Sequence, residues 1–212
     1  MGSILQVDQT RPSESVLAEA AATLAFGGVV IMPTDSVYGI GCAAIPDNPG
    51  HDRIFSIKRR ERSQKLPWLI ADFDDLPRYA AGVSEGALRL ATLCWPGALT
   101  LVMRASGEVP PEYQSADGTI ALRMPDSNLV RELARRAGAP LATTSANTHG
   151  EAAATSGSGV EGRLVEEADL TLDAGPAPLS VASTIVSVVG SEFRVLRDGA
   201  IPSSRLQELL RG

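Results

Sequence analysis

Residues 29–41 read VVIMPTDSVYGIG, and this stretch decides the architecture of the chain. Residues 29–32 are a short apolar run, largely β-branched and bounded by a glycine and a proline, which predicts a buried strand. The strand runs directly into hydroxyl and carboxylate side chains, beginning with Thr34 and Asp35, and then into two glycines that let a backbone approach a ligand closely. This composition indicates a pocket rim. A plain strand-to-turn junction, in which Thr34 and Asp35 satisfy backbone groups, fits the residues equally well.

The same pattern recurs at two further predicted strands. Residues 119–123 (TIALR) form an alternating strand that ends at Arg123, and residues 141–144 run into Ser145-Ala146-Asn147. Local capping or turn formation by Ser145 and Asn147 is a competing interpretation. The recurrence favours a shared site, because three strands that each end in polar side chains are expected to meet at one crevice.

The remaining elements predict a mixed sheet with helices on its faces. Helices are expected over residues 13–26 (capped by Ser13), 52–60, 84–95, 126–136 (capped by Asp126) and from 203 onward, and further strands over 66–71, 98–103, 170–173, 183–189 and 193–197. The small, polar segment 151–162 predicts a mobile loop. Strands and helices do not alternate regularly, so we expect a single α/β (α+β) domain over residues 1–212.

Length and composition exclude several classes of protein. With 212 residues, 44% of them apolar, the chain is long enough for one sizeable core, and no run reaches the about 18 apolar residues of a membrane span. The first residues show no secretory signal, so a cytoplasmic location is expected. The two cysteines predict buried thiols rather than a disulfide, and the two histidines are too far apart to suggest a metal site. A net charge of −6 argues against binding nucleic acid over the whole surface.

One segment departs from this acidic balance. Five of the eight residues from Lys58 to Lys65 are basic. Cations near a helix C-terminus offset its dipole, which accounts for two or three of them. Five favour a site for a polyanion such as a polyphosphate. No Gly-x-Ser-x-Gly, Ser-x-x-Lys or cysteine–histidine pairing supports covalent catalysis.

Seven segments together resemble the YrdC family of threonylcarbamoyl-adenylate synthases. They are PTDSVYGIG (33–41), IKRR (57–60), WPGALTLVM (95–103), ALRMPD (121–126), TTSAN (143–147), VASTIV (181–186) and VLRDGAI (195–201). The resemblance covers about residues 13–206, nearly the whole chain.

The resemblance implies a twisted mixed sheet around a deep, positively charged cavity that binds ATP, with Mg²⁺, beside L-threonine. The implied reaction joins L-threonine, bicarbonate or CO2 and ATP into threonylcarbamoyl-AMP and pyrophosphate, for transfer to tRNA by downstream threonylcarbamoyl-transferase proteins. Positions that match the threonine side of the family's site are Thr34, Arg123, Thr143 and Ser183. Positions that match the nucleotide side are Lys58, Arg60, Thr119, Ser145, Asn147 and Arg197, of which Lys58, Arg60, Ser145 and Asn147 form the family's Lys-x-Arg and Ser-x-Asn signature. The resemblance implies that these four are catalytic, with the ammonium of Lys58 and the guanidinium of Arg60 directed at the phosphates and with Ser145 and Asn147 orienting the phosphate oxygens. The protein itself is expected to supply no metal ligands.

The sequence also departs from the family pattern. Leu69 stands where many members have a histidine that contacts threonine, Ala153 where a serine is common, and Ala182 where the motif usually reads Glu-Ser-Thr. These departures are compatible with a diverged YciO-like protein acting on a related amino acid. A second alternative is a module of the same fold that binds double-stranded RNA or tRNA without this turnover.

Overall fold

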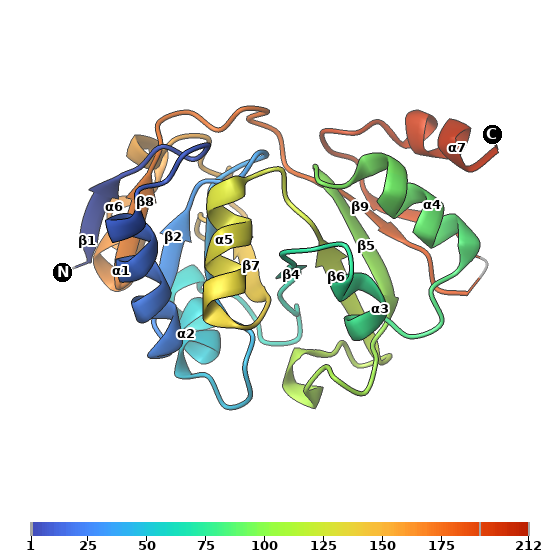
Figure 1. The fold of residues 1–212 in the computed structure, drawn as a ribbon, viewed down its shortest axis with the longest axis horizontal. Coiled ribbons are helices and arrows are strands. Elements are labelled where there is room, and N and C mark those ends of the chain that lie inside the picture. The colour runs from blue at the N-terminus through green and yellow to red at the C-terminus, as the bar shows by residue number, and fades with distance from the viewer. Residues whose placement is uncertain (1, 191, 212) are drawn as a thin grey trace.

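A ten-stranded mixed sheet organises the chain (Figure 1), in the strand order β1-β8-β2-β3-β7-β4-β6-β5-β9-β10. The structure is a computed structural model that describes residues 2–190 and 192–211. Its strands are β1 (Ser3–Gln6), β2 (Val30–Met32), β3 (Gly39–Ala43), β4 (Trp68–Leu69), β5 (Leu99–Arg104), β6 (Thr119–Arg123), β7 (Leu141–Ser145), β8 (Leu170–Asp173), β9 (Thr184–Ser187) and β10 (Arg194–Arg197). Its helices are α1 (Glu14–Ala25), α2 (Pro49–Lys58), α3 (Asp75–Tyr79), α4 (Glu85–Cys94), α5 (Asn128–Ala137), α6 (Gly162–Glu167) and α7 (Ser203–Arg211), with short 3-10 turns η1 (Pro111–Tyr113) and η2 (Gly157–Gly159).

The sheet mixes both strand orientations, as the sequence predicts. The central strand β7 runs antiparallel to both β3 and β4, whereas β4 pairs with β6 in parallel and β5 with β9 in parallel. This confirms a mixed α/β sheet. The polar ends of β6 and β7 therefore project at positions that depend on pairing partners far away in the sequence.

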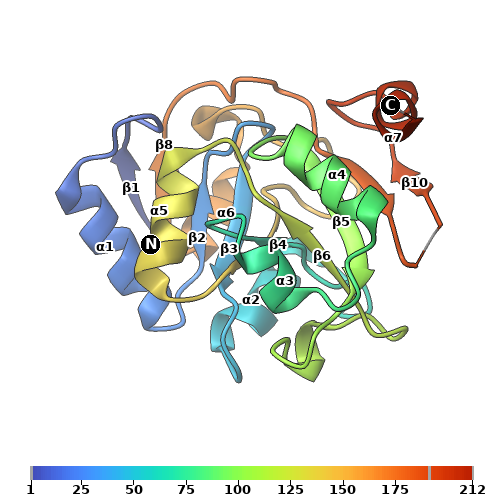
Figure 2. The same cartoon turned by 45° about the vertical axis from the view of Figure 1, so that its right-hand side comes forward.

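Helices cover both faces of the β2 region, which explains why residues 29–32 are apolar without alternation. Val30 and Met32 pack in one cluster with α1 and α5, while Val29 and Ile31 pack in a second cluster with α2 and α6. Figure 1 shows α1 and α5 lying side by side over the near face of the sheet. At the far end of the sheet, α4 and α7 lie together beside β9 and β10 (Figure 2).

Helix starts show where sequence reasoning was right and where it was wrong. Ser13 caps α1, because its hydroxyl accepts the Val16 N–H, as predicted. Ser127, and not Asp126, caps α5, because the Ser127 hydroxyl accepts the Val130 N–H. Helix α2 begins at Pro49, three residues earlier than predicted, because Asn48 supplies the cap and proline is tolerated in a first helical turn.

Four regular elements were not predicted: β1, β3, α3 and α6. Strand β3 occupies the glycines that the sequence suggested as part of a pocket rim, and α6 follows η2, which lies within the segment 151–162 predicted as a loop. Both cysteines are free, and Cys42 is buried as predicted, whereas Cys94 is only partly buried. None of the helices in the described part of the chain has the length and hydrophobicity that a membrane crossing requires.

Candidate active site

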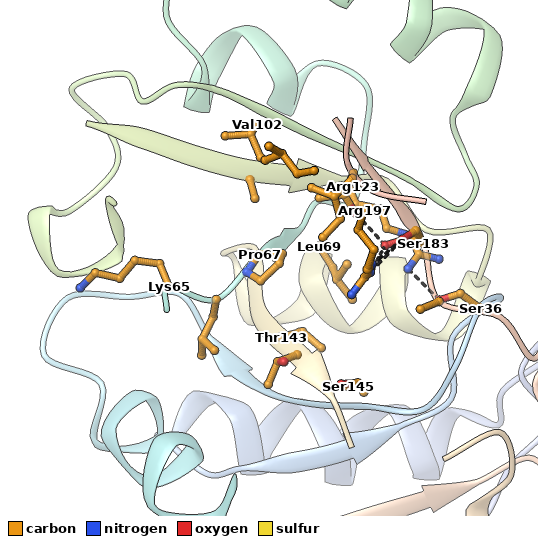
Figure 3. A pocket seen from close by; sticks show the side chains of 18 of the residues that line it. Ser36, Lys65, Pro67, Leu69, Val102, Arg123, Thr143, Ser145, Ser183 and Arg197 are labelled. Carbon is orange, nitrogen blue, oxygen red and sulfur yellow. Dashed lines mark hydrogen bonds between the residues drawn. The ribbon is translucent and has the colours of Figure 1, made fainter. Parts of the chain in front are cut away.

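A cavity of about 870 Å³ opens across the middle of the sheet (Figure 3). Its lining comes from both halves of the sheet and from the loops after β2, α2 and β7. Five cationic side chains line it (Arg60, Lys65, Arg123, Arg194 and Arg197), against two acidic ones (Asp117 and Glu151). In a chain of net charge −6, this cavity is a local concentration of positive charge, and it suits an anionic ligand.

The three polar strand ends do share one crevice, as predicted. Thr34, Arg123 and Ser145 all line the cavity, although β2, β6 and β7 are not neighbours in sequence. Of the ten residues that the family resemblance assigns to the site, nine line this cavity: Thr34, Arg60, Thr119, Arg123, Thr143, Ser145, Asn147, Ser183 and Arg197. Lys58 is the exception. What each residue does there stays a prediction.

Arg123, at the end of β6, is a buried cation held from three sides. Its Nε donates to the Gly97 carbonyl at 3.0 Å, its Nη1 to the Ser36 hydroxyl at 2.8 Å, and its Nη2 to the Asp35 carboxylate. Asp35 and Arg123 are only 4% and 5% exposed, so this is a buried ion pair. Burial raises the pKa of Asp35 and lowers that of Arg123, while each partner's charge opposes the effect.

The arrangement fixes Arg123 without saturating it. An arginine carries five N–H donors, and the three contacts leave two of them for a ligand in the cavity. Asp35 is not among the residues that line the cavity, so its role is to hold Arg123 in place. Its second oxygen, Oδ2, is buried and has no hydrogen-bond partner within residues 2–190 and 192–211.

The hydroxyl groups near Arg123 are buried and already bonded within the protein. Thr34 donates to the Val37 carbonyl at 2.7 Å and accepts the Ser36 N–H, which is the turn-forming role considered as an alternative for it. Thr143 donates to the Leu141 carbonyl at 3.0 Å, and the Ser183 and Thr100 hydroxyls lie 2.9 Å apart. The Thr143 hydroxyl can still accept a hydrogen bond from a ligand, whereas the Thr34 oxygen already accepts the Ser36 N–H and is also bonded to the Ser36 hydroxyl at 3.0 Å.

The glycines of β3 have a role that the sequence did not reveal. A Cβ atom on Gly41 would lie 2.5 Å from Thr143 Oγ1, and one on Gly39 would lie 2.7 Å from Thr143 Cγ2. They make room for the side chain of Thr143 on the adjacent strand β7. Gly39 also lines the cavity, in agreement with the predicted pocket rim, whereas Gly41 is not among the lining residues and its close approach is to β7.

Arg60 and Arg197 carry charge into another part of the cavity. Arg60 donates from Nη1 to the Thr144 hydroxyl at 2.9 Å, and Arg197 donates from Nη2 to the Ser183 carbonyl at 2.8 Å (Figure 3). Burial, together with the neighbouring charge of Arg197, lowers the pKa of Arg60. The charges of Arg60 and Arg197 repel one another, and an anion bound between the two guanidinium groups would relieve that repulsion. Thr119 also lines the cavity, with its hydroxyl bonded to Asp117 at 2.6 Å.

Lys58 lies behind the cavity wall, contrary to the expectation that its ammonium points at the nucleotide. It is 1% exposed, and its Nζ donates to the Ser145 carbonyl, to the Asn147 carbonyl at 2.6 Å and to Asn147 Oδ1 at 3.3 Å. An ammonium has three N–H donors, and all three are used. Burial and the charge of Arg60 lower the pKa of Lys58 to about 8.

Asn147 is likewise bonded to its own loop. Its Nδ2 donates to the Thr148 carbonyl at 2.9 Å and to the Glu151 carbonyl at 2.8 Å, while its Oδ1 accepts from Lys58. Of the four signature residues, Lys58 and Asn147 therefore shape the loop after β7. Arg60 and Ser145 present side chains to the cavity that they line.

The basic run after α2 does not act as one surface. Lys58 is buried, Arg60 and Lys65 line the cavity, and Arg62 forms an exposed ion pair with Asp52 at 2.8 Å. The polyanion prediction from this run therefore depends on two of its five cations.

Sequence reasoning assigned no role in the site to several residues that line the cavity: Ser36, Asp117, His149, Glu151 and Arg194. Lys65, which also lines it, belongs to the basic run predicted to bind a polyanion. Ser36 and His149 were within reach of prediction, because each lies two residues from a residue assigned to the site. Asp117 and Arg194 carry no signal of their own in the sequence. The three departures from the family pattern, Leu69, Ala153 and Ala182, all line the cavity.

Comparison with known proteins identifies the family. The profile of the Sua5/YciO/YrdC family, described as Telomere recombination, matches residues 22–199. A putative threonylcarbamoyl-AMP synthase of Mycobacterium leprae is 37% identical over 194 residues, which are 92% of this chain and 87% of that protein. The threonylcarbamoyl-AMP synthase of Bacillus subtilis is 31% identical over 204 residues, 96% of this chain and 59% of that one.

Solved structures agree with this assignment. The structure of Pyrococcus abyssi Sua5 complexed with L-threonine matches with a TM-score of 0.91 and 31% identity, over 98% of this chain and 60% of that one. Escherichia coli YciO matches with a TM-score of 0.87, over 97% of this chain and 99% of that one, and at 23% identity it supports the fold alone. The chain belongs to the Sua5/YciO/YrdC family, and it spans 60% of the length of the Pyrococcus chain.

Proposed function

We propose that this protein is a threonylcarbamoyl-AMP synthase, an enzyme that joins L-threonine, bicarbonate or CO2 and ATP with release of pyrophosphate. The observation that carries the proposal is the buried Arg123, held by Asp35 with two donors left over, in the same cationic cavity as Arg60 and Arg197. The relatives bearing that name, and the Sua5 structure titled as a complex with L-threonine, support the same activity.

In this proposal Arg123 binds the carboxylate of threonine. Its two unbonded N–H groups are charge-assisted donors, and the Asp35 contact keeps the guanidinium from turning away. Thr34, Thr143 and Ser183 surround the amino acid, and the Thr143 hydroxyl accepts a hydrogen bond from it. The amine of threonine adds to CO2 and loses a proton to form a carbamate.

The second part of the reaction is phosphoryl chemistry. A carbamate oxygen attacks the α-phosphorus of ATP, the new P–O bond forms as the bond to the β-phosphate oxygen breaks, and pyrophosphate leaves with the bonding electrons. Arg60 and Arg197 offset the negative charge that grows on the leaving group, and the Ser145 hydroxyl donates to a phosphate oxygen. Thr119 lies on the nucleotide side. No enzyme nucleophile is needed, because positioning and charge neutralisation carry the catalysis.

Lys58 and Asn147 contribute indirectly in this proposal, by holding the loop that presents Ser145. The residues that the structure describes contain no group of three histidine, cysteine, aspartate or glutamate side chains that could cage a metal ion. We propose that the phosphates and water would hold the Mg²⁺ that accompanies ATP, and we assign no protein ligand or catalytic step to it.

The experiment that tests the proposal is mass spectrometry of the products formed from ATP, bicarbonate and a panel of amino acids. We expect threonylcarbamoyl-AMP and pyrophosphate with L-threonine, and no adenylate when bicarbonate is omitted. An adenylate formed with a different amino acid would indicate the diverged, YciO-like activity that Leu69 and Ala182 admit. RNA affinity that falls steeply with salt, with no adenylate formed from any amino acid, would instead establish the RNA-binding alternative.

Two broader expectations follow from the proposal. The adenylate is an activated carbamoyl donor, so we propose that it passes to threonylcarbamoyl-transferase proteins that modify tRNA. We also propose a cytoplasmic location for the protein.

A further inference from the structure

The end of β7 and the loop that follows it supply five residues of the cavity lining: Ser145, Asn147, His149, Glu151 and Ala153. Ser145 at its start and His149 further along both line the cavity, whereas Thr148 between them does not. The loop is compact, because Asn147 Nδ2 bonds to the carbonyls of Thr148 and Glu151. Its shape sets where the Ser145 hydroxyl and the His149 ring lie relative to a bound ligand.

The back of this loop is bonded to helix α6. The Thr148 N–H donates to Glu161 Oε1 at 2.7 Å, and the Thr148 hydroxyl donates to Glu161 Oε2, also at 2.7 Å. Arg163 Nη2 donates to the same Thr148 hydroxyl at 2.7 Å, and its Nη1 donates to the Ile57 carbonyl in the last turn of α2 at 2.7 Å. We call Thr148, Glu161 and Arg163 the loop latch.

Glu161 occupies the N-cap position of α6 but makes no side-chain capping bond there. Its carboxylate accepts both donors of Thr148 instead, and those bonds hold the pKa of Glu161 below its usual value. A carboxylate that accepts two hydrogen bonds forms stronger contacts than a neutral acceptor. The residue best placed to cap α6 is therefore engaged with the cavity loop.

The latch acts on the same loop as Lys58 but from a different side. Lys58 bonds to the carbonyls of Ser145 and Asn147, and its own carbonyl accepts the His149 N–H at 2.9 Å. Thr148 lies between those anchoring points, and Glu161 holds it. The loop is thus tied to the end of α2 and to the start of α6.

We propose that Glu161 is a positioning residue for the nucleotide side of the cavity, acting through Thr148. The inference rests on the proposed function for its choice of ligand. With the latch intact, Ser145 and His149 are already placed for the triphosphate. Without the loop latch, ATP must order the loop when it binds, and this cost lowers the affinity for ATP. The binding of threonine at Arg123 is unaffected.

The test compares four variants of the full chain. Glu161→Ala removes both contacts with Thr148 and no capping bond, and Thr148→Val removes the hydroxyl alone. Thr148→Ser keeps the hydroxyl and is the conservative variant. Glu167→Gln is the matched control, because Glu167 pairs with Arg163 at 2.9 Å on the same helix and does not touch the loop.

Titration calorimetry with ATP and, separately, with L-threonine gives the first readout. We expect Glu161→Ala to raise the dissociation constant of ATP about tenfold and Thr148→Val about threefold, with that of threonine unchanged. Thr148→Ser and Glu167→Gln should match the unaltered protein. Equal losses of ATP and threonine affinity, or losses that follow the fraction of unfolded protein, would show a merely structural role and overturn the inference.

Amide hydrogen exchange in the ligand-free protein gives a second readout that does not depend on the proposed function. The Thr148 amide should exchange about tenfold faster or more in Glu161→Ala and at the original rate in Glu167→Gln. Unchanged exchange in Glu161→Ala refutes the latch and leaves the proposed function standing. If the unaltered protein binds no ATP, the proposed function fails, and exchange at Thr148 still decides whether Glu161 holds the loop.

Discussion

The ammonium group of Lys58 lies 2.6 Å from the backbone carbonyl oxygen of Asn147, and its remaining N–H bonds go to the Ser145 carbonyl and to Asn147 Oδ1. Two residues of the Lys-x-Arg and Ser-x-Asn signature are thus bonded to each other, 89 positions apart in the chain. This contact makes Lys58 a support for the loop from behind the cavity wall, and the first two predictions depend on it.

Replacing Lys58 with methionine should destabilise the protein. Lys58→Met leaves the buried carbonyls of Ser145 and Asn147 without their donor, which we expect to lower the free energy of unfolding by about 2–4 kcal/mol. Urea denaturation measures this. Arg62→Met is the control, because it breaks only the exposed ion pair with Asp52 and should cost less than about 1 kcal/mol. Equal effects of the two substitutions would contradict the role assigned to Lys58.

The same lysine predicts a pH dependence of stability. Burial lowers the pKa of Lys58 to about 8, from 10.5 in the unfolded chain. Between pH 8 and pH 10.5 the unfolded state binds more protons than the folded state. The contribution of Lys58 to the free energy of unfolding therefore rises with pH over this range, and this contribution is lost as the pH falls through about 8. The stability difference between the unaltered protein and Lys58→Met should therefore widen from pH 8 to 10. A constant or narrowing difference would rule out the lowered pKa.

The Asp35–Arg123 pair predicts that stability and threonine binding can be separated. Arg123→Met leaves the buried Asp35 carboxylate without its counter-charge and should cost about 3–5 kcal/mol of folding free energy. Adding Asp35→Asn should recover part of that loss, because a neutral amide needs no counter-charge, whereas threonine affinity should stay low. Denaturation and calorimetry on both variants check this. The role assigned to the Asp35–Arg123 pair would be contradicted if the stability losses of the two substitutions simply added. It would also be contradicted if the double variant bound threonine as the unaltered protein does.

Gly41 in β3 gives a prediction about packing between strands. Gly41→Ala places a Cβ atom 2.5 Å from Thr143 Oγ1, so we expect the free energy of unfolding to fall by about 1–3 kcal/mol. Gly162→Ala is the matched control, since a Cβ there meets nothing within 4 Å. Combining Gly41→Ala with Thr143→Ala should restore part of the stability. A tolerated Gly41→Ala would show that β3 and β7 can separate at this point.

Much of the fold could be predicted because its signals are local. Strand β2 (Val30–Met32) lies within the predicted apolar run 29–32, and Ser13 caps α1, as the capping serine indicated. Strand β3 was missed because its glycines resemble a turn, and their β conformation follows from pairing with β2 on one side and β7 on the other. Helix α5 begins at Asn128 and is capped by Ser127 and not by Asp126, since two adjacent residues that can both cap a helix leave the choice to local packing.

The sequence by itself determined which side chains end the strands, and hence that Thr34, Arg123 and Ser145 belong to one site. Only the tertiary structure decided which of the cations meet the cavity and which are bonded within the protein: Arg60 and Arg197 line it, whereas Lys58 holds the loop from behind. The physical reason is that a charged side chain takes whichever partners the fold places within reach, and for Lys58 those partners are backbone carbonyls distant in sequence.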